Sequence, residues 1–162
     1  MIIEDLLVSN CLVRCCKAAE KDAKGKERKL SFSPESGEYF LLFKIDNENG
    51  FKFLKNIGMK NPHNERKNDY IGIYLKVDVF KKVLLLIELK GKEIKHGISQ
   101  IKNVLKLLKK KYNEILRIFE LKAVIVHTHP LNHEQEIEID GVKCKLYRFC
   151  AKPSQVRVFL NE

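Results

Sequence analysis

The stretch that most limits the possible folds of this chain is Val83–Lys92, with the sequence VLLLIELKGK. Its first five residues are apolar, which is typical of a strand covered on both faces. Glu88 and Lys90 follow without a break, and the hydrophobic period changes directly after Gly91. From there to Ile115, apolar residues recur every three or four positions, which predicts a long amphipathic helix. A buried strand followed by such a helix indicates a layered α/β domain.

The segments on either side of this unit predict further strands and one further helix. Apolar residues at helical spacing from Ile3 to Val13 predict a first helix over residues 2–23. Asn49-Gly50 and Asp140-Gly141 have the chemistry of tight hairpin turns. The β-rich runs predict strands over residues 38–46, 51–57, 69–77, 82–90, 121–129 and 155–160, and a hairpin over residues 136–149. This order of elements predicts an α/β domain with a mixed sheet.

Length and composition fit a single domain over residues 1–162, large enough for a hydrophobic core. Glu4 and Asp5 interrupt the N-terminal apolar residues, so no signal peptide is expected. The apolar runs are too short to cross a bilayer, and we therefore expect no membrane association. The five cysteines are an odd number without a secretory pattern, which is typical of reduced thiols in a cytoplasmic protein.

The positive charge of the chain is concentrated in one window. The formal net charge is +10, and residues 81–111 contain ten lysines against two glutamates, which leaves +8 there. A basic stripe around one helix is expected of a protein that binds nucleic-acid phosphates, and a lysine-rich solvated face is the alternative. The residues near the start of this helix that we expect to contact nucleic acid are Lys92, Lys95, His96 and Lys102. A solvated helix histidine is an equal alternative for His96.

A second carboxylate is expected opposite Glu88. Asp69 opens the preceding strand, and a symmetric hairpin turning near Asp78 would place Asp69 directly across the ladder from Glu88. Directly opposed residues have Cβ atoms roughly 4.5–5.5 Å apart. Lys90, two residues after Glu88, lies on the same face. Two carboxylates this close require neutralisation, which Mg²⁺ provides with oxygen ligands. The alternative is a surface salt-bridge cluster at the open end of the hairpin.

This arrangement resembles the PD-(D/E)XK nuclease superfamily, which has a restriction-endonuclease-like fold. The resemblance covers roughly residues 60–128 and consists of Asp69 in ERKNDYIGIYL, Glu88 and Lys90 in LLLIELKGK, and Gln100 in the following helix. It implies a mixed β-sheet flanked by helices, with an α-β-β-β-α-β core. In this chain, extra C-terminal antiparallel strands would extend the core.

The resemblance also implies roles for particular residues. Asp69 and Glu88 would ligate Mg²⁺ (Mn²⁺ is possible), together with the carbonyl of Leu89. Lys90 would orient or activate the attacking water and stabilise charge on the phosphate. Gln100 would support the site from the helix.

Two positions depart from the family pattern, and three further acids are candidates for the site. Asn68 stands where the family has proline. Val104 stands where the recombination-exonuclease branch has tyrosine, so membership of that branch is not implied. Glu65 is an outside candidate for the site, and either Glu4 or Glu20 could supply the glutamate that the family often adds from its first helix.

The resemblance implies a Mg²⁺-dependent nuclease that acts on nucleic acid, most plausibly an endonuclease acting on DNA, with a homodimer as a possible assembly. A Holliday-junction-type resolvase, a non-catalytic nucleic-acid-binding domain on the same fold and an interaction protein solubilised by its lysines are the alternatives. His127, His129 and His133 lie close in sequence, but no fourth ligand is evident, so we expect no zinc site there.

Overall fold

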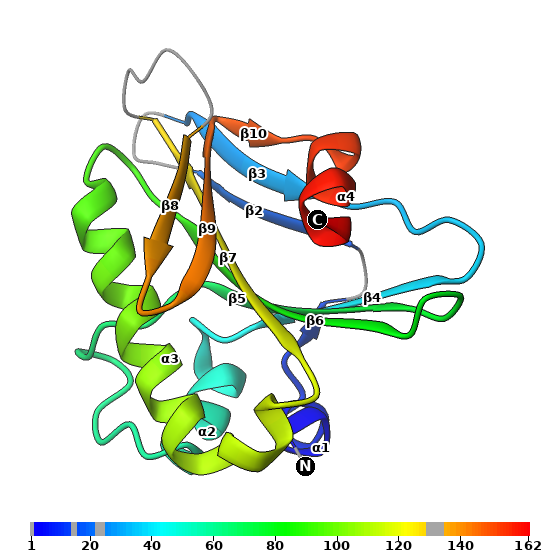
Figure 1. Ribbon diagram of the computed structural model, residues 1–162. Helices are drawn as coiled ribbons and strands as arrows, with labels where there is room; N and C mark the ends of the chain where they lie inside the picture. The colour runs from blue at the N-terminus through cyan, green and yellow to red at the C-terminus, as the bar shows by residue number, and fades with distance from the viewer. Residues whose placement is uncertain (1, 14–15, 22–24, 129–134) are drawn as a thin grey trace.

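The computed structural model describes residues 2–13, 16–21, 25–128 and 135–162 (Figure 1). In these residues the helices are α1 (Ile2–Val8), α2 (Glu48–Asn56), α3 (Ile94–Leu116) and α4 (Pro153–Asn161). The strands are β1 (Leu12–Val13), β2 (Lys17–Lys21), β3 (Glu27–Ser31), β4 (Glu38–Lys44), β5 (Tyr70–Lys76), β6 (Lys81–Leu89), β7 (Glu120–His127), β8 (Gln135–Ile139), β9 (Val142–Arg148) and β10 (Cys150–Ala151). The fold is therefore mixed α/β, as the sequence predicts. None of the described helices is both long and apolar enough to cross a membrane.

Two sheets organise the described chain. The larger is mixed and has the order β1-β4-β5-β6-β7-β9-β8, and the smaller has the order β10-β3-β2. Strands β4, β5 and β6 form an antiparallel meander, after which α3 returns the chain so that β7 lies parallel to β6. The hairpin of β8 and β9 is antiparallel within itself, but β9 pairs in parallel with β7. We expected antiparallel C-terminal strands. The strands β8 and β9 are antiparallel to each other, but β9 is parallel to its other neighbour, β7.

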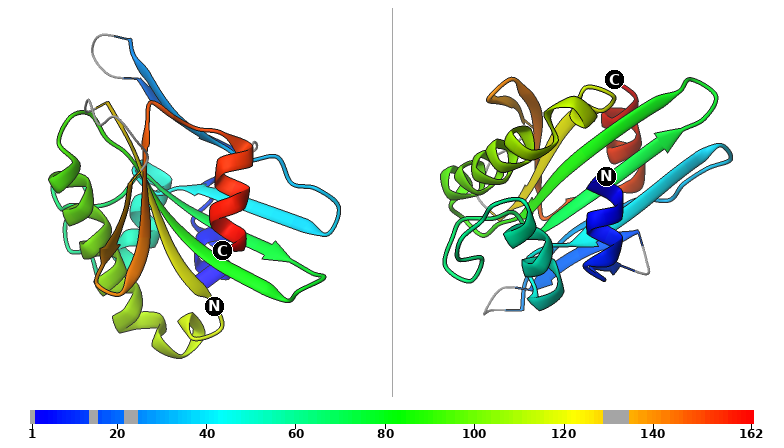
Figure 2. Two further views of the ribbon diagram at one scale, coloured as in Figure 1. Left: turned by 45° about the horizontal axis from the view of Figure 1, so that its top comes forward. Right: turned by 90° about the horizontal axis from the view of Figure 1, so that it is seen from below.

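The large sheet is covered on both faces. Figure 1 shows α3 and α4 on opposite sides of the central strands, and Figure 2 shows the same separation from two further directions. Leu84 and Leu86 of β6 belong to a core with residues of α1, α2 and α3, whereas Leu85 and Ile87 belong to a core with residues of the small sheet and α4. The apolar run of β6 is thus buried on both sides, which is what its continuous hydrophobicity predicts.

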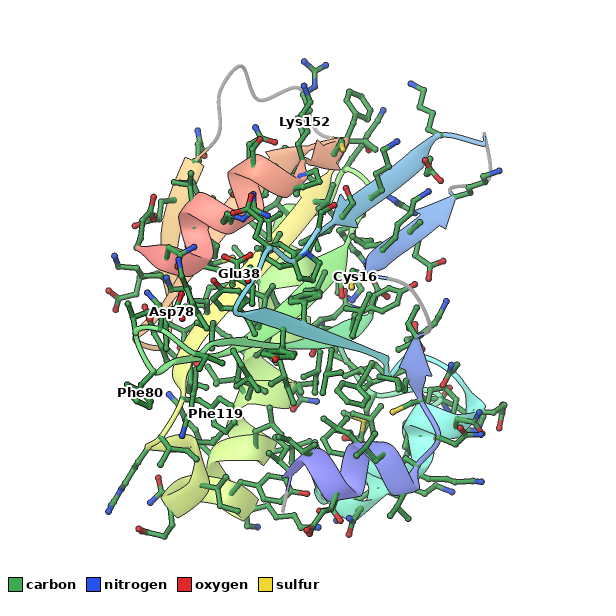
Figure 3. The ribbon with its side chains drawn as sticks, turned by 90° about the vertical axis from the view of Figure 1, so that its right-hand side faces the viewer. Cys16, Glu38, Asp78, Phe80, Phe119 and Lys152 are labelled. Carbon is green, nitrogen blue, oxygen red and sulfur yellow. The ribbon has the colours of Figure 1, made fainter. Side chains whose placement is uncertain are left out.

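The strand pair β5–β6 and the helix α3 confirm the predictions for the central part of the chain. The β5–β6 register is symmetric, from Lys76 opposite Lys81 to Tyr70 opposite Ile87. Asp78 and Phe80 lie in the connecting turn at the margin of the molecule, where the Phe80 side chain is exposed (Figure 3). The predicted hairpin with its turn at Asp140-Gly141 is also present, as β8 and β9.

The prediction of one helix over residues 2–23 is wrong. Helix α1 ends at Val8, and Asn10 adopts a positive φ of 54°, a conformation that asparagine tolerates after a helix. Leu12 and Val13 then pair with β4, and residues 17–21 form β2. Cys11 and Cys16 lie in the range of this predicted helix but outside α1, and Cys15 lies outside the described residues. Strand β3 was not predicted; it pairs with β2 and β10.

The prediction of a turn at Asn49-Gly50 followed by a strand is also wrong, because these residues belong to α2. The Asn47 side chain accepts a hydrogen bond from the Gly50 N–H at 2.7 Å and caps the helix. Phe53 and Leu54 are fully buried on one face of the helix. Gly50 packs directly against the backbone of Ile45, so close approach, and not turn conformation, accounts for this glycine.

The predicted last strand, residues 155–160, is the helix α4. Pro153 occupies the first helical position, where its missing N–H is not needed. The Lys152 N–H donates to Gln155 Oε1 at 2.9 Å at the start of the helix. Val156, Phe159 and Leu160 are buried at helical spacing, a pattern that a six-residue apolar window does not distinguish from a strand.

Candidate active site

Asp69 and Glu88 occupy opposed positions at one end of the β5–β6 pair. The last paired residues of the ladder are Tyr70 and Ile87, and Asp69 and Glu88 are the next position on each strand. The Asp69 N–H donates to the Ile87 carbonyl at 3.1 Å, one residue before Glu88, so Asp69 lies just outside the regular ladder. The Leu89 N–H donates to Asp69 Oδ2 at 2.7 Å and fixes the Asp69 carboxylate against β6. The structure therefore brings the two predicted carboxylates together.

The two carboxyl groups have strongly raised pKa values. Burial, with a contribution from the charge of Asp69, raises the pKa of Glu88 from its ordinary 4.5 to about 9. Burial likewise raises the pKa of Asp69 from 3.8 to about 7, although the Leu89 N–H opposes the shift. Lys90 lies with its Nζ 3.8 Å from Glu88 Oε1 and lowers both pKa values. Such a pair retains a proton at neutral pH unless a cation replaces it.

Glu88 has one oxygen without a protein partner. The residue is 1% exposed, and no described residue forms a hydrogen bond with its buried Oε2. Gly97 in the first turns of α3 lies over Glu88, since a Cβ at this glycine would be 3.3 Å from Glu88 Cγ. The glycine leaves the helix close to the carboxylate without a side chain between them. An unsatisfied buried carboxylate oxygen is costly, which indicates a site for a cation or a donor.

Asp46, which the sequence analysis missed, lies beside the pair. It follows β4 after Ile45, and its N–H donates to the Asp69 carbonyl oxygen at 3.3 Å. Its negative charge raises the pKa of both Asp69 and Glu88, and its Oδ1 lies 3.2 Å from Nζ of the buried Lys67. An acid directly after an apolar strand is the same signal that identified Glu88. We did not predict Asp46 as a site residue, because the residues that follow it were assigned to a hairpin turn.

Helix α3 holds the segment that precedes Asp69. Gln100 Nε2 donates to the Lys67 carbonyl at 2.6 Å, and Asn103 Nδ2 donates to the Arg66 carbonyl at 2.7 Å. No described residue forms a hydrogen bond with the buried Oε1 of Gln100. Gln100 therefore contacts the loop that leads into the site and not the two carboxylates, which favours a positioning role.

The remaining acidic candidates lie in other surroundings. Glu65 accepts a hydrogen bond from the Asn61 N–H at 2.5 Å within its own loop. Glu20 lies on β2, not on the first helix, and its Oε1 lies 2.6 Å from Nζ of Lys44. The charge of Glu20 still raises the pKa of Asp69, so it is near the pair. Glu4 is exposed on α1.

Three of the four residues predicted to contact nucleic acid surround one pocket at the start of α3. This pocket has a volume of about 670 Å³ and is lined by Arg66, Lys92, Glu93, Ile94, Lys95 and His96. It directly follows Lys90 in the chain. Lys102 instead lines a second pocket of about 450 Å³ further along the helix, where its Nζ lies 3.1 Å from Asp140 Oδ1. The predicted nucleic-acid contacts are thus divided between two pockets, and the first lies nearer to Lys90 in the sequence.

The described residues contain no group of three or more His, Cys, Asp or Glu side chains placed to hold a metal ion. His127 is buried at the end of β7, whereas His129 and His133 lie outside the described residues. Comparisons of the chain with protein-family models, curated proteins and solved structures gave no match. The geometry of Asp69, Glu88 and Lys90 therefore carries the functional argument.

Proposed function

We propose that this protein is a Mg²⁺-dependent nuclease that hydrolyses phosphodiester bonds in nucleic acid, most plausibly as an endonuclease acting on DNA. The observation that carries the proposal is the pair formed by the half-buried Asp69 and the buried Glu88, with Lys90 beside it. Lys90 balances only one of the two carboxylates, so the pair retains a proton unless a further cation binds. A divalent cation bound with a phosphate would supply that balance.

The topology supports a restriction-endonuclease-like fold. Strands β4, β5 and β6, the helix α3 and the strand β7 have the order and directions of the β-β-β-α-β part of the expected core. Helix α1 precedes them, with β1–β3 inserted before β4 and α2 inserted before β5. The two carboxylates and Lys90 lie where this fold would have its site. Fold alone does not deliver function, so the argument remains with the site.

The donor atoms of the site fit Mg²⁺. The ion prefers oxygen ligands and is commonly held by one or two carboxylates, with water and phosphate oxygens in the other positions. Asp69 and the unpartnered Oε2 of Glu88 would hold it, with the Leu89 carbonyl as the third expected ligand. Mn²⁺ has the same preference for oxygen. The bound ion would lower the pKa of a water molecule and neutralise charge that develops on the phosphate.

The surrounding side chains would prepare the site for phosphoryl transfer. Lys90 is the nearest cation to Glu88 among the described residues, and it would orient the attacking water and stabilise negative charge on the phosphate. Gln100 would keep the segment before Asp69 in place through the Lys67 carbonyl. Asp46 and its partner Lys67 would adjust the charge around the carboxylates without being ligands themselves.

The test is cleavage of supercoiled plasmid, linear duplex, single-stranded DNA and RNA, and a four-way junction, each with Mg²⁺, Mn²⁺ or EDTA. Metal-dependent cleavage of at least one substrate is expected. Strong preference for the junction would identify a structure-specific resolvase. Binding without cleavage under every condition would contradict the proposal and favour a non-catalytic nucleic-acid-binding domain.

Metal and pH are expected to change the stability of the protein together. Because the folded protein raises both carboxyl pKa values, it binds more protons than the unfolded chain between about pH 4 and pH 9. The free energy of unfolding of the metal-free protein should therefore fall as pH rises through this range. At pH 8, Glu88→Gln should raise the Tm in EDTA by about 5 °C. Saturating Mg²⁺ should raise the Tm of wild type but not of Glu88→Gln.

Thermal melts at pH 5.5, 7.0 and 8.5, with Mg²⁺ or EDTA, measure these effects. Glu93→Gln is the matched control, because Glu93 is exposed at the start of α3 and should change neither the pH dependence nor the Mg²⁺ response. A wild-type Tm that rises with pH in EDTA would contradict the electrostatics described for the pair.

The basic residues at the first pocket should determine how nucleic-acid binding depends on salt. Each lost phosphate contact lowers the slope of log K against log salt by about 0.9 for duplex DNA. The double variant Lys92→Ala/Lys95→Ala should therefore lower the slope by about 2 units. The control Lys82→Ala/Lys152→Ala removes two exposed lysines that line neither pocket, and should leave the slope almost unchanged. Equal slopes for the two double variants in a fluorescence-anisotropy titration would show that the pocket does not contact phosphates.

A further inference from the structure

Arg28 is a buried arginine without a counter-ion in the described part of the chain. It lies on β3, is 8% exposed, and its buried Nε has no hydrogen-bond partner among the described residues. No described residue forms an ion pair with its guanidinium. Its cross-strand neighbour Glu20 would be the expected partner, but Glu20 Oε1 instead contacts Lys44 at 2.6 Å and the Tyr70 hydroxyl at 3.2 Å. A buried charge left uncompensated is unfavourable, so its retention requires an explanation.

Backbone hydrogen bonds hold β3 across the ends of the strands that carry the candidate site. The Lys29 N–H donates to the Phe149 carbonyl at 3.1 Å, and the Phe149 N–H donates to the His127 carbonyl at 2.8 Å. The Thr128 N–H donates to the Gly91 carbonyl at 3.2 Å. This series of bonds connects β3 through β9 and β7 to the residue that follows Lys90.

Arg28 reaches this same residue. A Cβ at Gly91 would lie 3.6 Å from Arg28 Nη1, and no other heavy atom lies within 4 Å of that position among those described. Gly91 lies in the bend that follows β6, directly after Lys90, whose Nζ lies 3.8 Å from Glu88 Oε1. Arg28 therefore lies beside the residue that follows the lysine of the candidate site.

We propose that Arg28 and the open space at Gly91 form a phosphate-binding subsite that takes a nucleic-acid phosphate next to the one at Lys90. The inference deepens the proposed function and depends on it for the identity of the ligand. A guanidinium presents paired N–H donors that match two phosphate oxygens, and this interaction strengthens where water is excluded. The phosphate would supply the missing counter-ion. Glycine at position 91 would leave this space open for the phosphate, whereas a larger side chain would fill it.

The test compares Arg28→Met with Lys29→Met in EDTA, where no metal-dependent cleavage occurs. Lys29 is the adjacent residue on β3 and is a more exposed cation that pairs with Glu27. The Lys29→Met substitution therefore removes the same charge from the other face of the strand. Affinity for a labelled DNA duplex is measured by anisotropy at several salt concentrations. Arg28→Met should weaken binding about 10-fold and lower the salt slope by about 1, whereas Lys29→Met should change affinity less than about 2-fold.

Two further measurements separate ligand binding from folding. If Arg28 has no protein partner, Arg28→Met should keep the Tm of the free protein or raise it, because the uncompensated charge is removed. Gly91→Val should weaken DNA binding while Arg28 is retained. Arg28→Lys, which keeps the charge but loses the paired donors, should recover only part of the affinity. A fall in Tm for Arg28→Met with no change in DNA affinity would overturn the proposal and assign Arg28 a structural role.

These outcomes are distinct from failure of the proposed nuclease activity. Absence of cleavage by wild type, together with the expected loss of affinity in Arg28→Met, would leave the phosphate subsite in place and remove the catalytic function. Metal-dependent cleavage with unchanged DNA affinity in Arg28→Met would retain the nuclease and reject the subsite. Equal loss of affinity in Arg28→Met and Lys29→Met would also reject it, because the effect would then be one of net charge.

Discussion

Glu88→Gln and Lys90→Met are each expected to lower the rate of metal-dependent cleavage by at least about 100-fold while DNA binding changes little. Glutamine at position 88 keeps the shape of the side chain but removes the charge that would hold Mg²⁺ with Asp69. Methionine at position 90 keeps the length of the lysine but removes the cation 3.8 Å from Glu88. Both changes remove charge stabilisation at the reacting phosphate, and neither lies on the basic surface lined by Lys92 and Lys95.

The measurement is single-turnover cleavage of the best substrate, with DNA affinity measured separately in EDTA. Lys82→Met is the matched control for Lys90→Met, since Lys82 lies on the same strand, exposed near its other end. Glu114→Gln is the matched control for Glu88→Gln, since Glu114 is exposed near the end of α3 and lines neither pocket. Cleavage that persists in both site variants would place the activity at another site or in a contaminant. Loss of both binding and cleavage would instead indicate a damaged fold.

Gly50→Ala is expected to lower the free energy of unfolding by about 3 kcal/mol or more, although alanine is the better helix former. A Cβ at Gly50 would lie 2.5 Å from the Ile45 carbonyl oxygen and 2.6 Å from its carbonyl carbon. These are backbone atoms, so no side-chain rotation relieves the overlap. Either α2 or the end of β4 must move, which would also separate Phe53 and Leu54 from the core.

Urea denaturation followed by circular dichroism measures this effect. Lys52→Ala is the control, because Lys52 is an exposed residue of the same helix and its substitution should change stability by less than about 0.5 kcal/mol. A neutral or stabilising Gly50→Ala would contradict the close packing of α2 on β4. Because Asp46 directly follows Ile45, the residue that the new Cβ would contact, we also expect Gly50→Ala to reduce cleavage in whatever fraction remains folded.

The central unit of the fold could be predicted from the sequence because its signals are local and long. The 23-residue helix α3 exceeds the length at which strand and helix patterns are confused, and the short apolar run of β6 directly precedes it, bounded by charged residues and Gly91. The position of Asp69 opposite Glu88 followed from the symmetry of a hairpin whose turn was correctly placed. The two carboxylates and the lysine could therefore be identified from the order of residues alone.

The shorter elements could not be predicted, because contacts distant in sequence decide them. Residues 48–56 contain a glycine and aromatic residues that are typical of a hairpin, yet the Asn47 cap and the contact of Gly50 with Ile45 make them a helix. Residues 155–160 alternate like a strand, but the proline before them begins a helix. Asp46 was lost with the first of these errors. Arg28 gave no sequence signal, since its burial depends on where β3 crosses the other strands.

Helix α3 contacts both halves of the carboxylate pair, which has a mechanical consequence. Gly97 lies over Glu88, while Gln100 and Asn103 hold the segment just before Asp69. The first turns of the same helix also line the larger basic pocket. A polyanion bound at these turns would therefore exert force on both carboxylates at once through helix α3.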